Sequence, residues 1–393
     1  MALDQRPLEE ADLDQVWEIE REAFNADPSH QEHWRKWERA IGPERLEGLF
    51  EAGRLVAMAG VLAFGQWFGG RAIPMGGVRA VAVRPERRGR GYAARVVRAA
   101  IDAMHRRGET ISVLFPQVTR PYRSLGWEIA GTVVYRQVPT RSLAQVATPD
   151  VTVQRAGERD HDAIRACYAR VARENNGWVD RPSGRWDWFF DRFSDDHLYV
   201  ADGDGYVLYR HLPLPSNSPP DGFNLMVLEL VAATATAWRA LWSLVAASAA
   251  IAPTTYFRGG GVDPLAMHLG APDVTVLRER PWMLRMVDAP GAVAARGFPD
   301  DVGCVVPLEI ADGVCPWNGG RFTLVVEKAR GRLEPGGAGA VRVGIGALSA
   351  LFSGHATTSL LARAGLLEGG SDGDRAALDR VFAGAMPWMF DEF

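Results

Sequence analysis

The stretch from Val78 to Ala94 reads V-R-A-V-A-V-R-P-E-R-R-G-R-G-Y-A-A. A β-rich run ends there in a loop of arginine and glycine, and the loop opens a helix rich in arginine and alanine. Free N–H groups and the positive end of the helix dipole favour an anion at such a junction, and glycine lets the backbone approach that anion closely. The stretch therefore predicts a site for the pyrophosphate of a nucleotide.

Predicted strands and a helix surround this loop in an alternating order. Arg54–Phe64 and Ala72–Val83 are expected to form a hairpin around a Gly69-Gly70 turn. Apolar spacing predicts a helix over Arg90–Arg107, and a predicted strand over Thr110–Phe115 follows it. This order is typical of a mixed α/β domain.

The start of this domain recurs later in the chain. Gln5–Asp14, an acidic cap before an amphipathic helix, is matched by Gln154–Asp162 about 149 residues further on. We therefore expect a duplicated unit, with one copy over residues 1–147 and a second over 148–288. The second copy has Ala232–Trp238 where the first has its loop, and this segment contains neither glycine nor arginine. The second copy is expected to be degenerate, so one cofactor site per chain is predicted.

A third domain, over residues 289–393, is expected where the composition changes near Pro290. Its predicted strands include Cys304–Ala311 and Arg321–Lys328, and the turn C-P-W-N-G-G that begins at Cys315 joins them. One further strand and several short helices are predicted from Val341 onwards. This arrangement indicates an α+β unit.

Composition limits the classes of protein to consider. Apolar residues make up 47% and charged residues 23% of the 393 residues, which indicates a globular chain. The net charge of −4 argues against a general nucleic-acid binder, and no apolar run reaches the length of a membrane span. Three cysteines without a C-x-x-C pair indicate a reducing cytoplasm. No metal is expected, since His30, Glu32 and His33 lie in a polar stretch and are interpreted as solvated.

Arginines gather around the loop in a protein of acidic net charge. Nine of them fall within 29 residues, against two acids: Arg79, Arg84, Arg87, Arg88, Arg90, Arg95, Arg98, Arg106 and Arg107. A solvated helix face, a nucleic-acid surface and a phosphate site are the three interpretations. A nucleic-acid surface does not need glycine at the turn and usually carries aromatic residues for stacking. The patch therefore suits the phosphates of one bound cofactor better.

A second motif, P-Y-R-S-L-G-W over Pro121–Trp127, lies one predicted strand downstream. The first motif, Arg88-x-x-Gly91-x-Ala93, resembles the R/Q-x-x-G-x-G/A signature of the GNAT acyltransferases, whose nucleotide is acetyl-CoA. In that superfamily a Y-x-x-x-G-[FYW] run lies beside the thiol end of the cofactor, which implies that Tyr122 protonates the departing thiolate. A phenol of pKa about 10 stays protonated at neutral pH and can donate in this way. A tyrosine that only packs against Trp127 is the structural alternative.

The loop, the degenerate second copy, the C-P-W-N-G-G turn and the ending Asp391-Glu392-Phe393 together resemble the Eis (enhanced intracellular survival) family of N-acetyltransferases. The resemblance covers essentially the whole chain. It implies tandem GNAT domains, then a sterol-carrier-protein-like domain, and a homohexamer. It also implies that the terminal carboxylate of Phe393 is the general base. Because an α-carboxyl of pKa about 3.5 is a weak base for an ammonium, we expect burial and the neighbouring acids to raise it, or a water to relay the proton.

The resemblance also implies a cofactor site for acetyl-CoA. The pantetheine arm is expected along a strand formed by Val81, Ala82 and Val83, next to Ala80, where the family can carry a larger aromatic residue. The phosphates are expected at a loop and helix start made of Arg87, Arg88, Gly89, Arg90, Gly91, Tyr92, Ala93 and Ala94. The thiol end is expected near Gln117 and Val118.

The acceptors implied by the resemblance are primary amines, either aminoglycoside-like polyamines or lysine side chains. An acidic mouth formed by Asp27, Asp391 and Glu392, with Trp34 and Trp37 lining it, would suit a polycation. We expect acetyl to pass directly from acetyl-CoA to the amine in a ternary complex, with no covalent enzyme intermediate. The alternative from another class is a non-catalytic protein that binds CoA or a lipid on the same scaffold.

Overall fold

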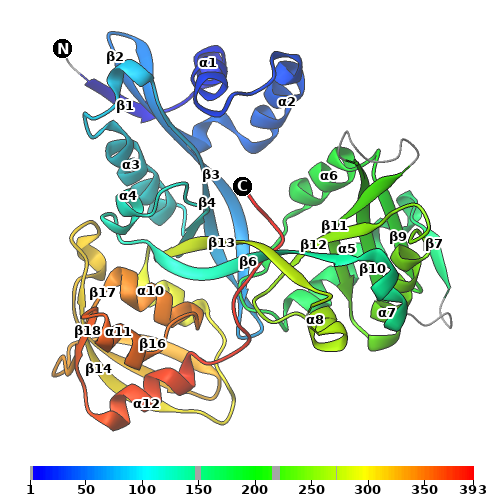
Figure 1. The fold of residues 1–393 in the computed structure, drawn as a ribbon. Coiled ribbons are helices and arrows are strands. Elements are labelled where there is room, and N and C mark those ends of the chain that lie inside the picture. Colours follow the sequence, from blue (N-terminus) through cyan, green and yellow to red (C-terminus); the bar gives the residue numbers. More distant parts are fainter. Residues whose placement is uncertain (1–2, 147–151, 215–221, 271) are drawn as a thin grey trace.

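The computed structural model describes residues 3–146, 152–214, 222–270 and 272–393, which form three lobes (Figure 1). The first lobe is blue and cyan, the second green, and the third orange and red. Yellow strand β13 (Thr275–Met286) crosses from the second lobe to the first. The expected α/β order is confirmed in the first two lobes.

The first lobe contains six strands and four α-helices among its described residues. The strands are β1 (Leu3–Pro7), β2 (Leu46–Glu51), β3 (Arg54–Phe68), β4 (Arg71–Val83), β5 (Ile111–Leu114) and β6 (Glu128–Pro139). The helices are α1 (Leu13–Phe24), α2 (Gln31–Ile41), α3 (Tyr92–Arg106) and the short α4 (Arg120–Arg123).

The second lobe repeats the order of strand, helix and strands. Its strands are β7 (Val153–Arg155), β8 (Val179–Asp180), β9 (His197–Ala201), β10 (Gly205–Pro213), β11 (Phe223–Ala232), β12 (Thr254–Gly259) and β13. Its helices are α5 (His161–Ala172), α6 (Ser183–Arg192), α7 (Ala235–Ala246) and α8 (Pro264–Leu269).

The third lobe is an α+β unit with its own sheet. Its strands are β14 (Cys304–Ala311), β15 (Gly320–Glu327), β16 (Arg330–Pro335), β17 (Val341–Gly344) and β18 (Leu367–Gly369). Its helices are α9 (Ala289–Ala295), α10 (Ile345–Ser353), α11 (Thr358–Arg363) and α12 (Asp372–Val381). The described residues place these strands in the order β16-β15-β14-β17-β18.

The first two lobes share one sheet of thirteen strands among the described residues. Its order is β1-β2-β3-β4-β5-β13-β6-β12-β11-β10-β9-β7, with β8 paired to β3. Strand β13 of the second copy is inserted between β5 and β6 of the first, and β6 pairs in turn with β12. The sequence did not predict this exchange. The boundary expected between residues 147 and 148 lies outside the described residues.

The predicted hairpin and helix are present, with two shifted ends. Strand β3 runs on to Phe68 because the ladder with β4 continues to the pair Phe68–Arg71, closed by Gly69 and Gly70 at φ of 57° and 78°. Helix α3 begins at Tyr92 rather than at residue 90, because Gly91 has a left-handed φ of 77°. Each change follows from backbone geometry that glycine permits.

The ladder between β4 and β5 is parallel and short. It ends at the pair Gly77–Val113, whereas β4 continues to Val83. Among the described residues, one edge of β4 is therefore left without a strand partner beyond Gly77, and the loop after β4 leads into α3. This gap between two parallel strands positions the site described below.

Strand β16 was not predicted from the sequence, which indicated one strand after residue 328 where the structure has three. The turn before β16 is made by Lys328 and Ala329, with φ of 49° and 58°. Such positive φ values usually require glycine or asparagine. The hairpin therefore carries no sequence signal at its turn.

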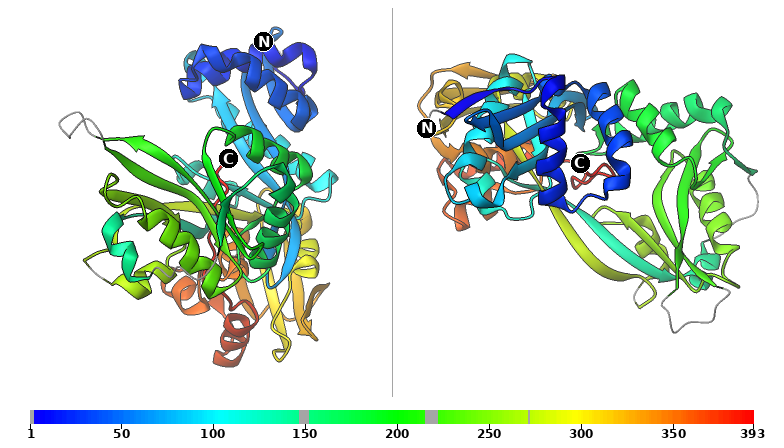
Figure 2. Two further views of the ribbon diagram at one scale, coloured as in Figure 1. Left: turned by 90° about the vertical axis from the view of Figure 1, so that its right-hand side faces the viewer. Right: turned by 90° about the horizontal axis from the view of Figure 1, so that it is seen from above.

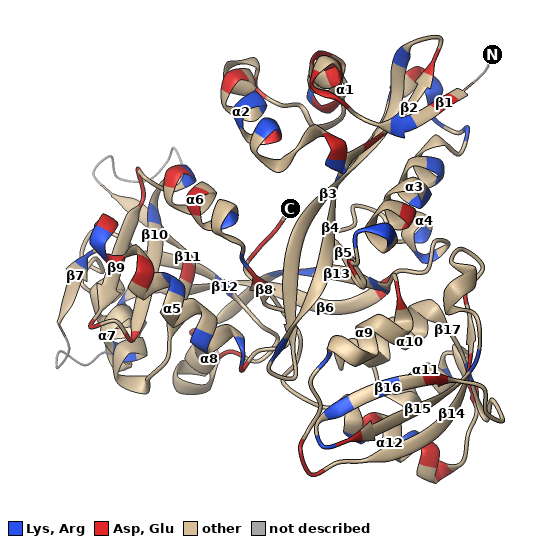
Figure 3. Ribbon diagram, turned by 180° about the vertical axis from the view of Figure 1, so that it is seen from behind, with Lys and Arg blue, Asp and Glu red and all other residues tan. Residues whose placement is uncertain are grey.

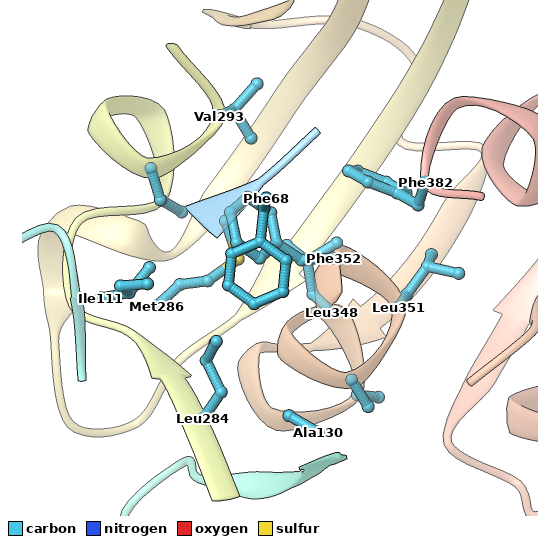
Figure 4. Close-up of a cluster of buried hydrophobic side chains, with 14 of the residues drawn as sticks. Phe68, Ile111, Ala130, Leu284, Met286, Val293, Leu348, Leu351, Phe352 and Phe382 are labelled. Atoms are coloured by element: carbon cyan, nitrogen blue, oxygen red, sulfur yellow. The ribbon is translucent and has the colours of Figure 1, made fainter. Parts of the chain in front are cut away.

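The third lobe docks on the first through an apolar interface (Figure 4). Phe68 at the end of β3 packs against Phe352 of α10, with ring centroids 5.7 Å apart, beside Met286 of β13. Buried Arg296, which follows α9, donates to the carbonyls of Phe352 at 3.0 Å and of Phe382 at 3.2 Å. A cation near helix C-termini is favoured by the helix dipole, so Arg296 ties the ends of α9, α10 and α12 together.

Across the described ranges, no helix combines the length and the apolar character that crossing a bilayer requires.

A buried charge cluster holds α1 and α2 to β4. Arg79 of β4 pairs with Glu38 of α2 at 2.5 Å, lies 3.7 Å from Glu20 of α1, and places its guanidinium 4.6 Å over the Trp37 ring. Trp34 donates its indole N–H to Glu20 at 2.9 Å. One cation thus faces two carboxylates, and burial raises the pKa of Glu20 to about 7.

Replacing Glu20 with glutamine should stabilise the fold in a pH-dependent way. Because the folded state raises the pKa of Glu20 above its ordinary value of 4.5, ionisation of this carboxyl weakens the fold as the pH rises from about 4.5 to about 7. Denaturant unfolding of Glu20→Gln should show no gain at about pH 4 and a gain at about pH 8. The control is Glu22→Gln, an exposed position on α1. A gain of equal size at both pH values would contradict this account.

Candidate functional site

The gap between β4 and β5 opens into a pocket of 540 Å³. The pocket brings together residues that the sequence assigned to different parts of one site: Val81, Ala93, Ala94, Gln117, Val118, Tyr122 and Phe393. They come from β4, α3, the segment after β5, α4 and the chain end. Among the predicted cofactor residues, Ala82 is instead buried in the cluster under α1, and Val83 packs against the cluster under α3.

The loop before α3 is open at the positions where a phosphate is expected. Gly89 and Gly91 both have φ of 77°, and no atom of the described residues lies within 4 Å of the position that a Cβ would take on either glycine. Gly91 is the N-cap of α3 and has no side chain to occupy the amides of the first turn. The residues present therefore fit a pyrophosphate bound at the helix start.

The corresponding helix start in the second lobe is closed. Thr234 caps α7, and its hydroxyl oxygen accepts from the amide of Ala237 at 3.2 Å. The side chain thus satisfies a donor that would otherwise bind an anion. This cap agrees with the prediction that the second copy is degenerate.

The structure divides the arginines of the loop into two groups. Arg84 is buried and donates to the carbonyl of Leu55, and Arg87 pairs with Glu51 at 2.5 Å. Arg88 and Arg90 are exposed. Among the described residues neither has an acidic partner, and Arg88 donates only to the carbonyl of Val83 at 3.4 Å, whereas Arg87 already has an anionic partner.

A β-bulge interrupts the pairing of β4 with β3 at the edge of the pocket. Met58 of β3 faces Ala82 and Gly60 faces Arg79, so Ala80 and Val81 stand opposite one residue of β3. Ala80 has φ of 50°, a left-handed value that is uncommon for alanine. Bulges of this kind leave backbone groups outside the ladder and occur next to active sites. Ala80 and Val81 both line the 540 Å³ pocket.

Tyr122 lies on α4, and its ring makes an edge-to-face contact with Trp127, with 6.2 Å between centroids. Its hydroxyl makes no hydrogen bond to any of the described residues, and burial raises the pKa of Tyr122 above its ordinary value. The hydroxyl is therefore a protonated, unengaged donor in the pocket.

The chain end reaches the pocket from the third lobe. Seen from above, the C-terminus lies beside the blue helices of the first lobe (Figure 2). The Phe393 ring packs against Phe64 at 5.4 Å and Phe115 at 6.0 Å. A Cβ on Gly77 would lie 2.7 Å from this ring, so the ring occupies space that a glycine leaves free.

The acidic entrance predicted from Asp27, Asp391 and Glu392 does not form in the structure. Asp391 is buried and pairs with Arg181 at 2.9 Å and Arg185 at 3.2 Å. Glu392 pairs with Arg258 and Arg280 and accepts from the Tyr135 hydroxyl. Figure 3 shows the red end of the tail beside blue segments of α6 and β13. Sequence alone did not reveal these arginines, because they lie 112 to 210 residues away from their partners.

The other predicted acceptor residues are scattered. Asp27 caps the short turn Pro28–His30 by accepting from the Ser29 amide at 2.9 Å. Trp34 packs on Trp17, with centroids 5.1 Å apart. Of this group, Trp37 lines a second pocket.

This second pocket, of 230 Å³, lies between α2, β3 and α6. Its lining is mostly apolar and includes Trp37, Phe64 and Trp188, together with Arg45 and Arg185. Because the Phe64 ring also contacts Phe393, the second pocket lies close to the chain end. Sequence reasoning missed Phe64 and Trp188, since neither belongs to a motif and only the sheet brings them together.

Comparison with known proteins agrees with this geometry. Models of an acetyltransferase (GNAT) domain match residues 4–130 and 177–286, and a model of a sterol carrier protein domain matches residues 289–390. An uncharacterized N-acetyltransferase of Streptomyces avermitilis is 28% identical over 347 residues, 82% of this chain and 83% of the relative. The N-acetyltransferase Eis of Mycobacterium tuberculosis is 28% identical over 341 residues, 80% of this chain and 79% of that protein.

Solved structures resemble the whole chain. A GCN5-related N-acetyltransferase from Kribbella flavida has a TM-score of 0.90 and 30% identity, and the match covers 100% of this chain and 98% of that one. Eis1 from Mycobacterium abscessus shares the fold at a TM-score of 0.82 and 24% identity, with full coverage of both chains. The predicted tandem GNAT domains with a sterol-carrier-like domain are confirmed, and so is an enzyme rather than a non-catalytic binder. The chain belongs to the Eis family of GCN5-related N-acetyltransferases and is an acyltransferase.

Proposed function

We propose that this enzyme transfers acetyl from acetyl-CoA to a primary amine while both are bound. The observation that supports this function is the 540 Å³ pocket, which unites the start of α3, Tyr122 and the chain end at Phe393. Tyr122, which we assign as the donor to the thiolate, and Phe393, whose carboxylate we assign to the amine, thus line the same cavity. The homohexamer implied by the resemblance stays a prediction.

Acetyl-CoA supplies an acetyl thioester when it is bound. We infer that the amides at the start of α3 hold its pyrophosphate, with Arg88 and Arg90 as phosphate partners. The edge of β4 beyond Gly77, at Val81, is suited to pair with the pantetheine arm. Backbone N–H groups on such an edge are donors for the carbonyl oxygen on which negative charge develops.

The reaction requires one base and one acid. An alkyl ammonium of pKa about 10 must lose a proton before it attacks, and we assign the Phe393 carboxylate to accept this proton, directly or through a water. The new N–C bond then forms as the C–S bond breaks. The Tyr122 hydroxyl donates to the departing thiolate, so the products are an amide and a free thiol.

Removing the Tyr122 hydroxyl should slow transfer without weakening donor binding. Tyr122→Phe keeps the ring against Trp127, and kcat for amine acetylation should fall about a hundredfold. Acetyl-CoA affinity, measured by calorimetry, should be unchanged. Tyr256→Phe, on β12 outside both pockets, is the matched control. Full turnover by Tyr122→Phe would leave the hydroxyl with a packing role only.

The linings of both pockets bear on the choice of acceptor. Among the described residues, neither lining contains aspartate or glutamate, whereas Arg45, Arg79, Arg185 and Arg280 contribute to them. These arginines are themselves paired with acids outside the linings, so a polycation placed there would find no carboxylate side chain of the lining to pair with. We therefore propose an amine with one positive charge on an apolar chain, such as a lysine side chain, ahead of an aminoglycoside.

A panel of acceptors tests this choice. Release of CoA thiol and the mass of the product should be measured with a lysine peptide of apolar flanks and with kanamycin. We expect kcat/KM for the peptide to be higher by about tenfold or more. A preference for kanamycin would contradict the proposed acceptor class, and no product with any amine would contradict the proposed reaction.

A further inference from the structure

We propose that Arg181 of the degenerate copy is a positioning residue, which holds Asp391 so that the Phe393 carboxylate stays in the pocket. The inference rests on the proposed function, because it presumes that this carboxylate acts on the amine. It gives the second lobe, which has lost the phosphate loop, a role in the reaction.

Arg181 is placed to bind two carboxylates at once. Its side chain is 2% exposed, and its Nη1 and Nη2 donate to Glu229 at 3.0 and 2.6 Å. Its Nε faces both oxygens of Asp391, at 3.1 and 3.0 Å. The guanidinium lies 4.1 Å from the Tyr168 ring centroid and 4.8 Å from that of Trp186. Such a planar, stacked and bidentate site requires arginine rather than lysine.

The cluster is balanced in charge, which makes its burial tolerable. Arg181 and Arg185 face Glu229 and Asp391, and the Tyr206 hydroxyl donates to Glu229. Burial alone would raise the pKa of Asp391, but the two arginines hold it below its ordinary value. If Asp391 left this cluster, the buried charge of its arginine partners would lose its compensation. The Asp391 side chain is therefore held strongly in place.

The next residue, Glu392, is held by arginines of two other strands. Glu392 pairs with Arg258 of β12 at 3.2 Å and with Arg280 of β13. Upstream, the Trp388 amide donates to the Asn176 carbonyl at 3.1 Å, and the Thr132 amide donates to the Pro387 carbonyl at 3.3 Å. The tail is thus fixed at successive points before it ends.

This attachment limits where the terminal carboxylate can move. Phe393 lies two residues after the Asp391 anchor point, and a chain of two residues spans about 7 Å at most. Because Glu392 is held as well, Phe393 is the one residue after Asp391 that no ion pair holds among the described residues. Its ring packs against Phe64 and Gly77. A displacement of about 1 Å at a reacting group can cost about a hundredfold in rate. The ion pair therefore acts on catalysis through the position of the chain end.

The first measurement detects the position of the chain end without using catalysis. Carboxypeptidase A removes a C-terminal phenylalanine only when the chain end is accessible, and mass spectrometry follows the loss of Phe393. Asp391→Asn should lose Phe393 about tenfold faster than the unmodified chain, because the tail opens locally more often. Asp204→Asn, which removes another second-lobe ion pair (Arg170, 2.6 Å), should leave the rate unchanged. Equal release from all three chains would overturn the proposal.

The second measurement connects the position to the reaction. With a lysine peptide, Asp391→Asn should lower kcat about tenfold or more at unchanged KM for acetyl-CoA, and it should cause no further loss in a chain that ends at Glu392. Equal losses in both backgrounds would indicate a structural role and overturn the proposal, as would faster release of Phe393 with unchanged kcat. If Asp391→Asn does not fold, Arg181→Lys, which keeps the charge and loses the bidentate geometry, takes its place in both measurements. Absence of transfer by the unmodified chain would overturn the proposed function, while the carboxypeptidase rates would still decide whether Asp391 holds the chain end.

Discussion

The ladder between β4 and β5 stops at Gly77 and Val113, and the site depends on the gap that this early end creates. Beyond it, the bulge at Ala80 and Val81 turns a free strand edge toward the cavity. Helix α3 starts at the same place with two left-handed glycines and an uncapped first turn. Parallel strands that part in this way expose backbone donors, because neither neighbour satisfies them.

The three lobes divide the tasks of the enzyme among them. The first lobe provides the gap, the open helix start and Tyr122. The third lobe carries the tail to the gap, and its docking through Phe68 and Phe352 fixes the direction in which the tail leaves. The second lobe has a closed helix start at Thr234, but it holds the tail through buried ion pairs. The exchange of β6 and β13 joins the first two lobes in one sheet, so the pocket of the first lobe and the arginines that hold the tail have a common rigid support.

Local patterns predicted the parts of the site that one segment can build. Gly89 and Gly91 predicted the loop because its conformation requires glycine at these positions. Tyr122 was predicted because it belongs to a short motif. The partners of Asp391 and Glu392 were not predictable in this way, since Arg181 and Arg258 are separated from them by more than a hundred residues. For this reason the sequence indicated a free acidic mouth where the structure has neutralised pairs. The hairpin turn at Lys328 and Ala329 and the insertion of β13 were missed for a similar reason, as neither leaves a local signal.

The role of the terminal carboxylate is the central claim, and one chemical change tests it directly. Protein ligation can convert the carboxylate of Phe393 to a carboxamide, which removes the base while the ring, the ion pairs of the tail and the pocket remain. We expect kcat for amine acetylation to fall about a hundredfold or more, with the affinity for acetyl-CoA unchanged. Full turnover by the carboxamide protein would contradict it.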